Sequence, residues 1–307
     1  MRIDRLDVYH VAMPLIYPWR TSYGEDYDIH SVLVKATSGD HAAWSEACPL
    51  QAPLYLPESV LSVFYHVTEF FGPHVLGREY DTADDINDRL AVFKGNSFAK
   101  AGIEECWWTL QTQITGTPLH RLLGGETREV SAGADFGIQD SIDMLLGNIQ
   151  MAVDAGTPRI KLKVARGWDL EMLMAVTDTF PDMTFHIDCN SGYTLDDLPF
   201  FKAIDGLGLA FIEQPLHYAD VLDHAELARQ IETPVCLDET IVSVKAAEQA
   251  LQVGACTYIN IKPGRVGGLA PPVDHGGEHV LGLGLGAEVV GRREEVALGV
   301  TARVVGQ

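Results

Sequence analysis

Five charged residues recur at a nearly constant interval in the second half of the sequence, and their types suit acid–base and metal chemistry. The interval is about 25 residues, and each charge lies at the end of a short apolar run. This length is about that of one strand, one helix and two short loops, so the charges are predicted to lie at the same end of successive parallel strands. This charge ladder consists of Lys163, Asp188, Glu213, Asp238 and Lys262.

The three carboxylates of the ladder predict a metal site. Asp188, Glu213 and Asp238 would repel one another strongly in a shared cavity, unless some are protonated or a hard divalent cation neutralises them. Ligands that are all oxygen suit Mg²⁺ or Mn²⁺ better than zinc. The alternative is structural, with each carboxylate capping a helix or pairing with a neighbouring lysine. The repeated spacing favours the metal site.

The two lysines of the ladder are candidate acid–base catalysts. We expect a lysine beside a bound cation in a dry cavity to have a lowered pKa, because like charge and burial both disfavour the ammonium form. A pKa of about 7–8 would make Lys163 or Lys262 a usable general base. The metal ion would then hold a substrate carboxylate and stabilise the enediolate that remains when the α-proton departs.

Two neighbours of the ladder are predicted to support it. Lys161 has the same side-chain orientation as Lys163, since side chains in a strand repeat every two residues. Charged interior residues are rare without a function, which favours a role for both lysines. Asn190 faces the same way as Asp188 and is expected to hydrogen-bond the metal shell or the substrate.

The elements that must position the ladder alternate strictly from residue 129 onward. Strands and helices follow each other in βα order, which indicates a parallel sheet. The expected fold class is α/β, a (β/α) barrel of the modified TIM type that is truncated or altered after strand 6, since a closed barrel needs eight strands. Strands are expected at 129–136, 159–164, 184–189, 209–214, 234–238 and 257–262, and helices at 140–155, 169–180, 195–203, 221–231 and 243–253.

The first part of the chain lacks this rhythm. Strand patterns come first and helical patterns follow, which predicts a compact α+β domain. Two of the strands are expected to form a hairpin through Gly39. The strands are expected at 3–13, 30–36 and 42–47, and the helices at 57–72, 82–93, 97–114 and 117–123.

The sequence changes character after residue 270. Residues 271–307 contain no aromatic residue, no Lys and no Ile, but are dense in Gly, Val and Leu. Such a segment would supply one strand and one helix, the helix over 292–305. We therefore predict three parts: 1–125 for the α+β domain, 126–270 for barrel strands 1–6, and 271–307 for an atypical Gly- and Val-rich segment.

Composition excludes several kinds of partner. The formal net charge of −21 argues against nucleic acid and against anionic membranes. The five cysteines show no CxxC spacing and indicate reduced thiols of a cytoplasmic protein. The sequence has no run of about 18 apolar residues, so no membrane span is expected. The expected partner is a small carboxylate substrate, and a homo-oligomer is compatible with the sequence.

The ladder motifs resemble those of the enolase superfamily, in its muconate lactonizing enzyme subgroup. Within it, the chain is most similar to o-succinylbenzoate synthases and N-succinylamino acid racemases, over residues 1 to about 269. The C-terminal segment of about 37 residues does not resemble the family. The shared motifs are Lys161-Leu-Lys163, Asp188-Cys-Asn190, Glu213-Gln-Pro215, Asp238-Glu239 and Asn260-Ile-Lys-Pro-Gly-Arg-Val-Gly-Gly268.

The resemblance implies a Mg²⁺-dependent enzyme and assigns roles to the ladder. Asp188, Glu213 and Asp238 would bind the metal. Lys163 would be a base, and Lys262 would lie on the opposite face of the substrate. In a synthase the second lysine would stabilise the enediolate electrostatically, whereas in a racemase it would be the other acid–base group.

The resemblance also implies an N-terminal capping domain, over 1–125, that closes over the barrel mouth. Residues 17–24 resemble a mobile specificity loop and 52–57 a second capping segment. Trp19, Thr21 and Tyr55 are the substrate contacts that follow from this. Glu239, directly after Asp238, would be a further supporting residue.

The ladder serves several reactions. We expect an o-succinylbenzoate synthase, a lyase that dehydrates a cyclohexadiene precursor in menaquinone biosynthesis. The alternatives within the superfamily are an N-succinylamino acid or other N-acylamino acid racemase, a dipeptide epimerase and a muconate cycloisomerase. A Schiff-base aldolase would also use a strand-end lysine, but the three in-phase carboxylates disfavour it. A non-enzymatic alternative is an inactive truncated barrel.

Overall fold

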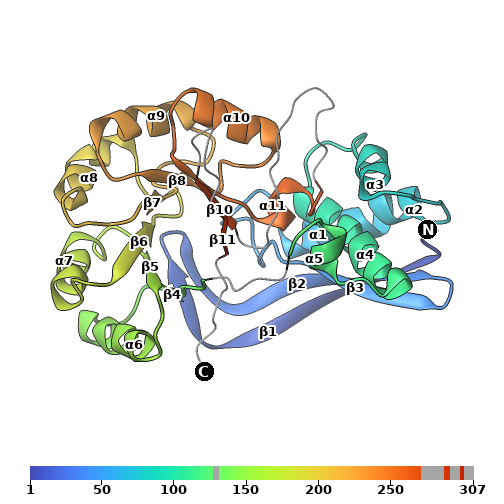
Figure 1. Cartoon of the computed structure of the whole chain (residues 1–307), viewed down its shortest axis with the longest axis horizontal. Helices are drawn as coiled ribbons and strands as arrows, with labels where there is room; N and C mark the ends of the chain where they lie inside the picture. Colours follow the sequence, from blue (N-terminus) through green and yellow to red (C-terminus); the bar gives the residue numbers. More distant parts are fainter. Residues whose placement is uncertain (127–130, 271–286, 291–297, 301–307) are drawn as a thin grey trace.

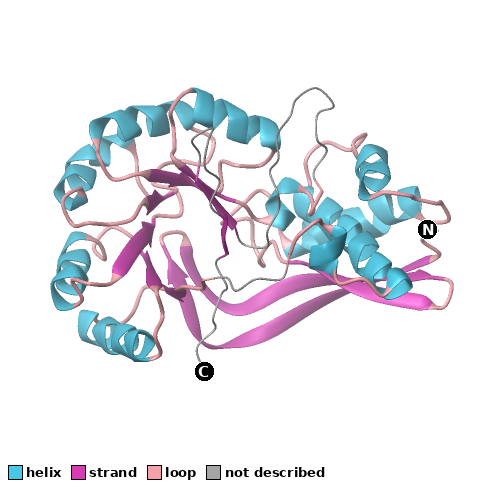
Figure 2. Ribbon diagram, viewed as in Figure 1, coloured by secondary structure: helices cyan, strands magenta, loops and turns pink. Residues whose placement is uncertain are grey.

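The computed structural model describes residues 1–126, 131–270, 287–290 and 298–300 of the chain. These residues form two adjoining bodies (Figure 1). One is a curved sheet with helices along its outside, and the other is a smaller α+β body. A long β-hairpin of the smaller body reaches across to the first strands of the curved sheet (Figure 2). The α/β fold with an N-terminal cap is thereby confirmed.

The curved sheet begins with six parallel strands in sequence order, and helices cover its outer side (Figure 1). Hydroxyl caps start several of these helices, as where Ser141 Oγ accepts the N–H of Met144 at 3.1 Å. The strands are β4 (Ala134–Phe136), β5 (Arg159–Lys163), β6 (Thr184–Asp188), β7 (Ile212–Glu213), β8 (Val235–Leu237) and β9 (Tyr258–Asn260). The helices are α6 (Ile142–Asp154), α7 (Leu170–Thr179), α8 (Leu198–Ile204) after the 3₁₀ turn η2 (Leu195–Asp197), α9 (Val221–Gln230), α10 (Val244–Gln252) and α11 (Pro263–Val266).

Beyond β9 the sheet changes direction. Strand β10 (Ala287–Val290) pairs antiparallel with β9, and β11 (Leu298–Val300) pairs antiparallel with β10. The predicted alteration after the sixth strand is therefore confirmed. The helix predicted over 292–305 is wrong at β11, where branched and apolar residues form a strand. The rest of that helix, and residues 129–130 of the first predicted strand, lie outside the described residues.

The smaller body packs helices on an antiparallel sheet of order β1-β2-β3. The one hairpin that the sequence predicts is confirmed, with Gly39 at φ +55° in the turn between β2 and β3. In the described part of the chain, no helix is long and apolar enough to cross a membrane. The elements are β1 (Arg5–Thr21), β2 (Gly24–Ser38), β3 (His41–Ala47), α1 (Val60–His66), the π-helix η1 (Val67–Phe71), α2 (Gly72–Val75), α3 (Ala83–Leu90), α4 (Ser97–Thr115) and α5 (Leu119–Leu122).

The first strand is longer than its sequence pattern predicts. β1 continues to Thr21, which pairs with Gly24, and Trp19 pairs with Asp26. The segment 17–24, expected as a specificity loop, is thus the tip of the β1–β2 hairpin. The residues of this tip do not alternate between apolar and polar types, so the sequence pattern does not predict a strand here. Cross-strand pairing with β2 holds them in the strand instead.

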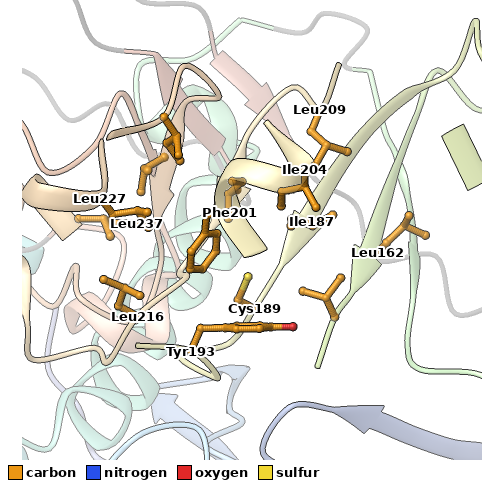
Figure 3. Close-up of a cluster of buried hydrophobic side chains, with 14 of the residues drawn as sticks. Leu162, Ile187, Cys189, Tyr193, Phe201, Ile204, Leu209, Leu216, Leu227 and Leu237 are labelled. Atoms are coloured by element: carbon orange, nitrogen blue, oxygen red, sulfur yellow. The ribbon is translucent and has the colours of Figure 1, made fainter. Parts of the chain in front are cut away.

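Buried apolar side chains form two separate clusters. One lies between the parallel strands and their helices, and includes Leu162, Ile187 and Leu237 (Figure 3). The other lies in the smaller body and includes Val34 and Ile103. On this basis we propose to keep the division 1–125, 126–270 and 271–307.

Glu104 on α4 ties the two bodies together. This side chain is completely buried and accepts the backbone N–H of Leu269 and of Ala270, each at 2.9 Å, and the indole N–H of Trp108 at 2.7 Å. Gly268 has φ +136°, and a Cβ at this position would lie 2.4 Å from Glu104 Oε2. Only glycine therefore lets the chain after α11 approach this carboxylate.

Replacement of Glu104 should weaken the fold measurably. Glu104→Ala removes the acceptor of three N–H donors, of which the Leu269 donor is buried and the other two are partly buried, so we expect the free energy of unfolding to fall by about 2–4 kcal/mol. Urea denaturation followed by circular dichroism measures this. Glu248→Ala, on the exposed side of α10, is the matched control and should change it by less than about 0.5 kcal/mol. Equal effects of the two substitutions would contradict the assignment.

The neighbouring Glu105 should make stability depend on pH. Burial, with the charges of Glu104 and Glu46, raises the pKa of Glu105 from 4.5 to about 8. The folded state therefore binds this proton more tightly than the unfolded state, and stability falls as the pH rises from about 4.5 to about 8. We expect Glu105→Gln to become more stable relative to the parent by about 1–2 kcal/mol between pH 5 and pH 8, allowing for partial exposure. Parallel pH profiles in urea denaturation would refute this.

Candidate active site

The structure brings the charge ladder to one end of the parallel sheet. Lys163, Asp188 and Glu213 end β5, β6 and β7, and the register pairs Lys163 with Asp188 and Asp188 with Glu213. Asp238 directly follows β8, and Lys262 follows β9 after one intervening residue. This is the arrangement that an interval of about one βα unit predicts.

Asp188 is the meeting point of two lysines. Its Oδ2 lies 2.8 Å from Lys161 Nζ and 2.6 Å from Lys163 Nζ. Lys161 Nζ also lies 2.6 Å from Glu213 Oε2. Both lysines therefore point to the same face, as their spacing in the strand predicts. Their side chains are almost completely buried, so these ion pairs are largely shielded from solvent.

A second group of charges surrounds Asp238. Its Oδ1 is paired with the guanidinium of Arg265, and its Oδ2 lies 2.8 Å from Lys262 Nζ. The hydroxyl of Tyr55 donates to Asp238 Oδ2 at 2.5 Å and accepts from Lys262 Nζ at 2.6 Å. The Lys262 ammonium also lies 4.6 Å from the centre of the Tyr55 ring. Tyr55, a residue of the smaller body, thus hydrogen-bonds the Asp238 carboxylate at the end of a barrel strand.

Asn190 connects the two groups. Its Oδ1 accepts from Lys163 Nζ at 2.8 Å, and its Nδ2 donates to Glu239 Oε1 at 3.0 Å. Its own backbone N–H donates to Asp188 Oδ1 at 2.9 Å. The predicted supporting residues Asn190 and Glu239 therefore do lie in the site.

Neighbouring carboxylates raise the pKa values of Lys161 and Lys163. Burial alone would lower the pKa of Lys161, but the charges of Asp188 and Glu213 outweigh burial and hold this pKa well above its ordinary value. The same competition raises the pKa of Lys163, with Asp188 as its main partner. The sequence predicts a lowered lysine pKa beside a bound cation, and this stays a prediction, because carboxylates are the nearest charges to these lysines in the structure.

The carboxylates respond in two ways. Burial would raise the pKa of Asp188, but Lys161 and Lys163 hold it below its usual value. Burial and the charges of Asp238 and Asp188 raise the pKa of Glu239 to about 8. The pKa values of carboxylates in this one site are therefore shifted in opposite directions.

The backbone around these residues is held in unusual conformations. Asn190, Ser191 and Gln214 have φ values of +43°, +62° and +38°, in the left-handed region that residues other than glycine rarely adopt. All three lie within three residues of the ends of β6 and β7. Strain of this kind persists only where surrounding contacts enforce it, and it is often found at functional sites.

The hairpin tip of the smaller body lies against these strand ends. Ser22 Oγ donates to the carbonyl oxygen of Cys189 at 2.7 Å, and the backbone N–H of Ile138 donates to the carbonyl oxygen of Arg20 at 3.0 Å. The ring centres of Tyr23 and Tyr55 are 6.2 Å apart. The smaller body therefore covers the mouth of the sheet with residues from both of its predicted capping segments.

The three predicted substrate contacts lie in different places. Tyr55 hydrogen-bonds the charged residues described above. Thr21 is buried at the hairpin tip. Trp19 lines a pocket of about 340 Å³ between the hairpin and α6, together with Met144 and Met151. Contact with a substrate remains a prediction for all three residues.

Sequence reasoning missed two charged residues of the site. Arg265 is almost completely buried and also donates to the carbonyl oxygen of Ile241 at 2.8 Å. Its signal was an arginine three residues after a ladder lysine, in a segment otherwise rich in glycine. Asp135 in β4 lies in register with Lys161, one ladder interval earlier, and its Oδ1 is buried. Extending the ladder back by one strand would have indicated it.

The donor set fits a hard cation. Within the described residues no three Asp, Glu, His or Cys side chains already converge on one point, because lysines and Arg265 lie between the carboxylates. Asp188, Glu213 and Asp238 nevertheless offer only oxygen atoms, which suit Mg²⁺ or Mn²⁺. Among the residues that the structure describes, Glu239 Oε2 is buried and has no hydrogen-bond partner, which is compatible with an additional positive group beside it.

Several known proteins are similar to this chain. Residues 145–274 match the family described as enolase C-terminal domain-like. An N-succinylamino acid racemase from Thermus thermophilus is 38% identical over 87% of this chain and 73% of its own length. An o-succinylbenzoate synthase from Bacillus subtilis is 36% identical over 88% of this chain and 72% of its own length. A solved enolase superfamily structure from Listeria innocua superposes with a TM-score of 0.83 at 31% identity, over 88% of this chain and 73% of that one.

The buried pair of Arg265 and Asp238 should be strongly coupled. Arg265→Met leaves the carboxylate with only Lys262 as a cationic partner, so we expect the free energy of unfolding to fall by about 2–4 kcal/mol. In a double-mutant cycle with Asp238→Asn, the coupling energy should exceed about 1.5 kcal/mol. The exposed pair of Arg229 and Glu226 is the control, with an expected coupling below about 0.5 kcal/mol. Coupling as small as that of the control would show that burial does not strengthen the inner pair.

Proposed function

This chain belongs to the enolase superfamily, and from that premise we propose that it is a Mg²⁺-dependent o-succinylbenzoate synthase. The observation that carries the proposal is the placement of Lys163 and Lys262 on either side of three carboxylates at the ends of adjacent strands. Two lysines so placed face a substrate carboxylate from opposite sides. The similarity to the synthase of Bacillus subtilis supports this substrate class.

Lys163 is the proposed general base. It removes the proton α to the substrate carboxylate, which leaves an enediolate. In a syn dehydration the hydroxyl group departs from the same face as the proton, so Lys163 is also placed to return that proton to the leaving hydroxide. One water is released, and the ring of the cyclohexadiene precursor becomes aromatic.

Lys262 is proposed to stabilise the enediolate from the opposite face. Its ammonium is held by Tyr55 and Asp238, and its side chain is 40% exposed, so it is accessible to a ligand. A fixed positive charge beside a developing negative charge lowers the barrier to its formation. Tyr55 and Asp238 would therefore orient Lys262.

Asp188, Glu213 and Asp238 are the proposed Mg²⁺ ligands. When bound there, the ion would neutralise these carboxylates and the carboxylate of the substrate. Lys163 would then lose the charge of Asp188 that keeps its pKa high, while its burial would continue to favour the neutral amine. Lys161 would remain beside Glu213 as a supporting cation.

The second candidate is an N-succinylamino acid or other N-acylamino acid racemase. The racemase of Thermus thermophilus is similar to this chain at an identity comparable to that of the synthase. For this reaction Lys262 would be the second proton donor, held in place by the Asp238 and Tyr55 contacts that it shares with Arg265. Dipeptide epimerisation and muconate cycloisomerisation would use the same groups, but no observation favours them.

The decisive experiment assays the purified 307-residue chain with Mg²⁺ on two substrates. Dehydration of the cyclohexadiene precursor supports the synthase. Exchange of the α-proton of an N-succinylamino acid for deuterium, with inversion, supports the racemase. Loss of either activity in EDTA and its return with Mg²⁺ supports the metal requirement. Absence of both activities in a folded chain would support the inactive truncated barrel instead.

Replacement of Lys163 should separate catalysis from metal binding. We expect Lys163→Ala to lower the rate of α-proton exchange by at least about 10³-fold, because Lys163 is the proposed base and Lys161 is held by Glu213 as well as by Asp188. Mg²⁺ affinity, measured by isothermal titration calorimetry, should change by less than about tenfold. Lys245→Ala, at an exposed position on α10, is the control and should retain full activity. Exchange that survives in Lys163→Ala would mean that the base is misassigned.

A further inference from the structure

Gln214 holds the backbone directly after the proposed ligand Glu213. It is completely buried, and its φ of +38° is unusual for a residue with a side chain. Its backbone N–H donates to the carbonyl oxygen of Cys236 at 2.8 Å. This bond continues the pairing of β7 with β8 beyond the last residue of β7. The conformation of Gln214 is therefore part of how the two strand ends are joined.

The side-chain amide of Gln214 binds the end of the next strand. Its Oε1 accepts the backbone N–H of Asp238 at 3.0 Å and of Thr240 at 3.1 Å. Two N–H donors require an oxygen acceptor, which determines which way the amide is turned. Its Nε2 donates to Thr240 Oγ1 at 2.8 Å and to the carbonyl oxygen of Leu216 at 3.2 Å. One side chain thus links Glu213 to the backbone of Asp238.

His224 on α9 also belongs to this network. Its Nδ1 lies 2.5 Å from the carbonyl oxygen of Asp220, which can only accept, so Nδ1 carries the hydrogen. Its Nε2 is then an acceptor, which receives the backbone N–H of Leu216 at 3.1 Å and faces Gln214 Nε2 at 3.4 Å. The ring is completely buried, and burial lowers the pKa of His224, so the neutral form is the one present.

We propose that Gln214 and His224 are positioning residues that set the separation of Glu213 and Asp238. His224 holds the amide of Gln214, and this amide holds the backbone N–H of Asp238. In the described part of the chain, neither side chain hydrogen-bonds a ladder side chain, so the two residues act through the backbone of the strand ends. The metal role of the two carboxylates rests on the proposed function, whereas the hydrogen-bond network does not.

Amide hydrogen exchange, followed by NMR on the full chain, tests the network without any metal. We expect His224→Leu to accelerate exchange of the Asp238 amide by at least about tenfold relative to the Ala210 amide. The Ala210 N–H donates to the carbonyl oxygen of Phe185 at 2.8 Å, ahead of β7 in the same sheet, and serves as the internal reference. His224→Gln should restore exchange at Asp238 to within about threefold of the parent, since its amide oxygen replaces the Nε2 acceptor.

A milder variant covers the case in which His224→Leu does not fold. Thr240→Val keeps the shape of the side chain but removes the hydroxyl that accepts from Gln214 Nε2. We expect it to accelerate exchange at Asp238 by about threefold, again with Ala210 unchanged. Equal acceleration at both amides in these variants would overturn the proposal, because it would show a general loss of stability. Failure of a folded His224→Gln to restore Asp238 would also overturn it.

Mg²⁺ titration calorimetry connects the network to the proposed metal site. Loss of a residue that orients a ligand typically costs 10–100-fold in metal affinity, so we expect this loss in His224→Leu and its recovery in His224→Gln. His217→Leu, an exposed histidine in the same connection, is the control and should bind Mg²⁺ as the parent does. If the parent itself binds no Mg²⁺, the proposed function fails, and the exchange experiment still decides whether the network exists.

Discussion

The rest of the structure depends on the neutralisation of buried carboxylates at the ends of neighbouring strands. Asp188 lies in the sheet interior with two lysines on one of its oxygen atoms, and Asp238 is held between Lys262 and Arg265. A buried charge without a partner is costly, so these residues are compatible with folding only together. Strand register follows from this, because a shift by one residue would turn every one of these side chains to the opposite face. The same packing that stabilises the sheet therefore assembles the site.

The smaller body is required by the same constraint. The charges face the open end of the sheet, where water would otherwise compete for them, and the hairpin tip and Tyr55 cover that end. Tyr55 supplies a hydroxyl that is both donor and acceptor, which lets one side chain serve the carboxylate of Asp238 and the ammonium of Lys262. Glu104 on α4 binds the chain just after α11. The two bodies thus meet through polar contacts that fix the position of the β9–α11 segment, where Lys262 and Arg265 lie.

Much of this arrangement was predictable because it is periodic. Each ladder residue ends an apolar run, and one βα unit separates it from the next, so the strands, the helices between them and their common end follow from local patterns. Lys161 and Asn190 were predictable from the two-residue repeat of a strand. Arg265, Asp135 and Gln214 were not recognised, because their partners lie on other strands and nothing in their local sequence identifies those partners. The direction of the lysine pKa shift likewise depends on which charge is nearest, and in the structure that charge is a carboxylate.

The sequence by itself determined the order of the parallel strands, the end at which their charges gather and the oxygen-rich chemistry of that end. These features depend on residues close together in the chain, and strand and helix periodicity makes them regular. Only the tertiary structure decided how the charges pair, that Tyr55 completes the shell of Asp238 and that the sheet continues beyond β9 with antiparallel strands. Hydrogen bonds and ion pairs act over about 3 Å, and the groups they join here come from segments as far apart as residues 55 and 238. Folding, and not sequence spacing, brings such groups within that distance.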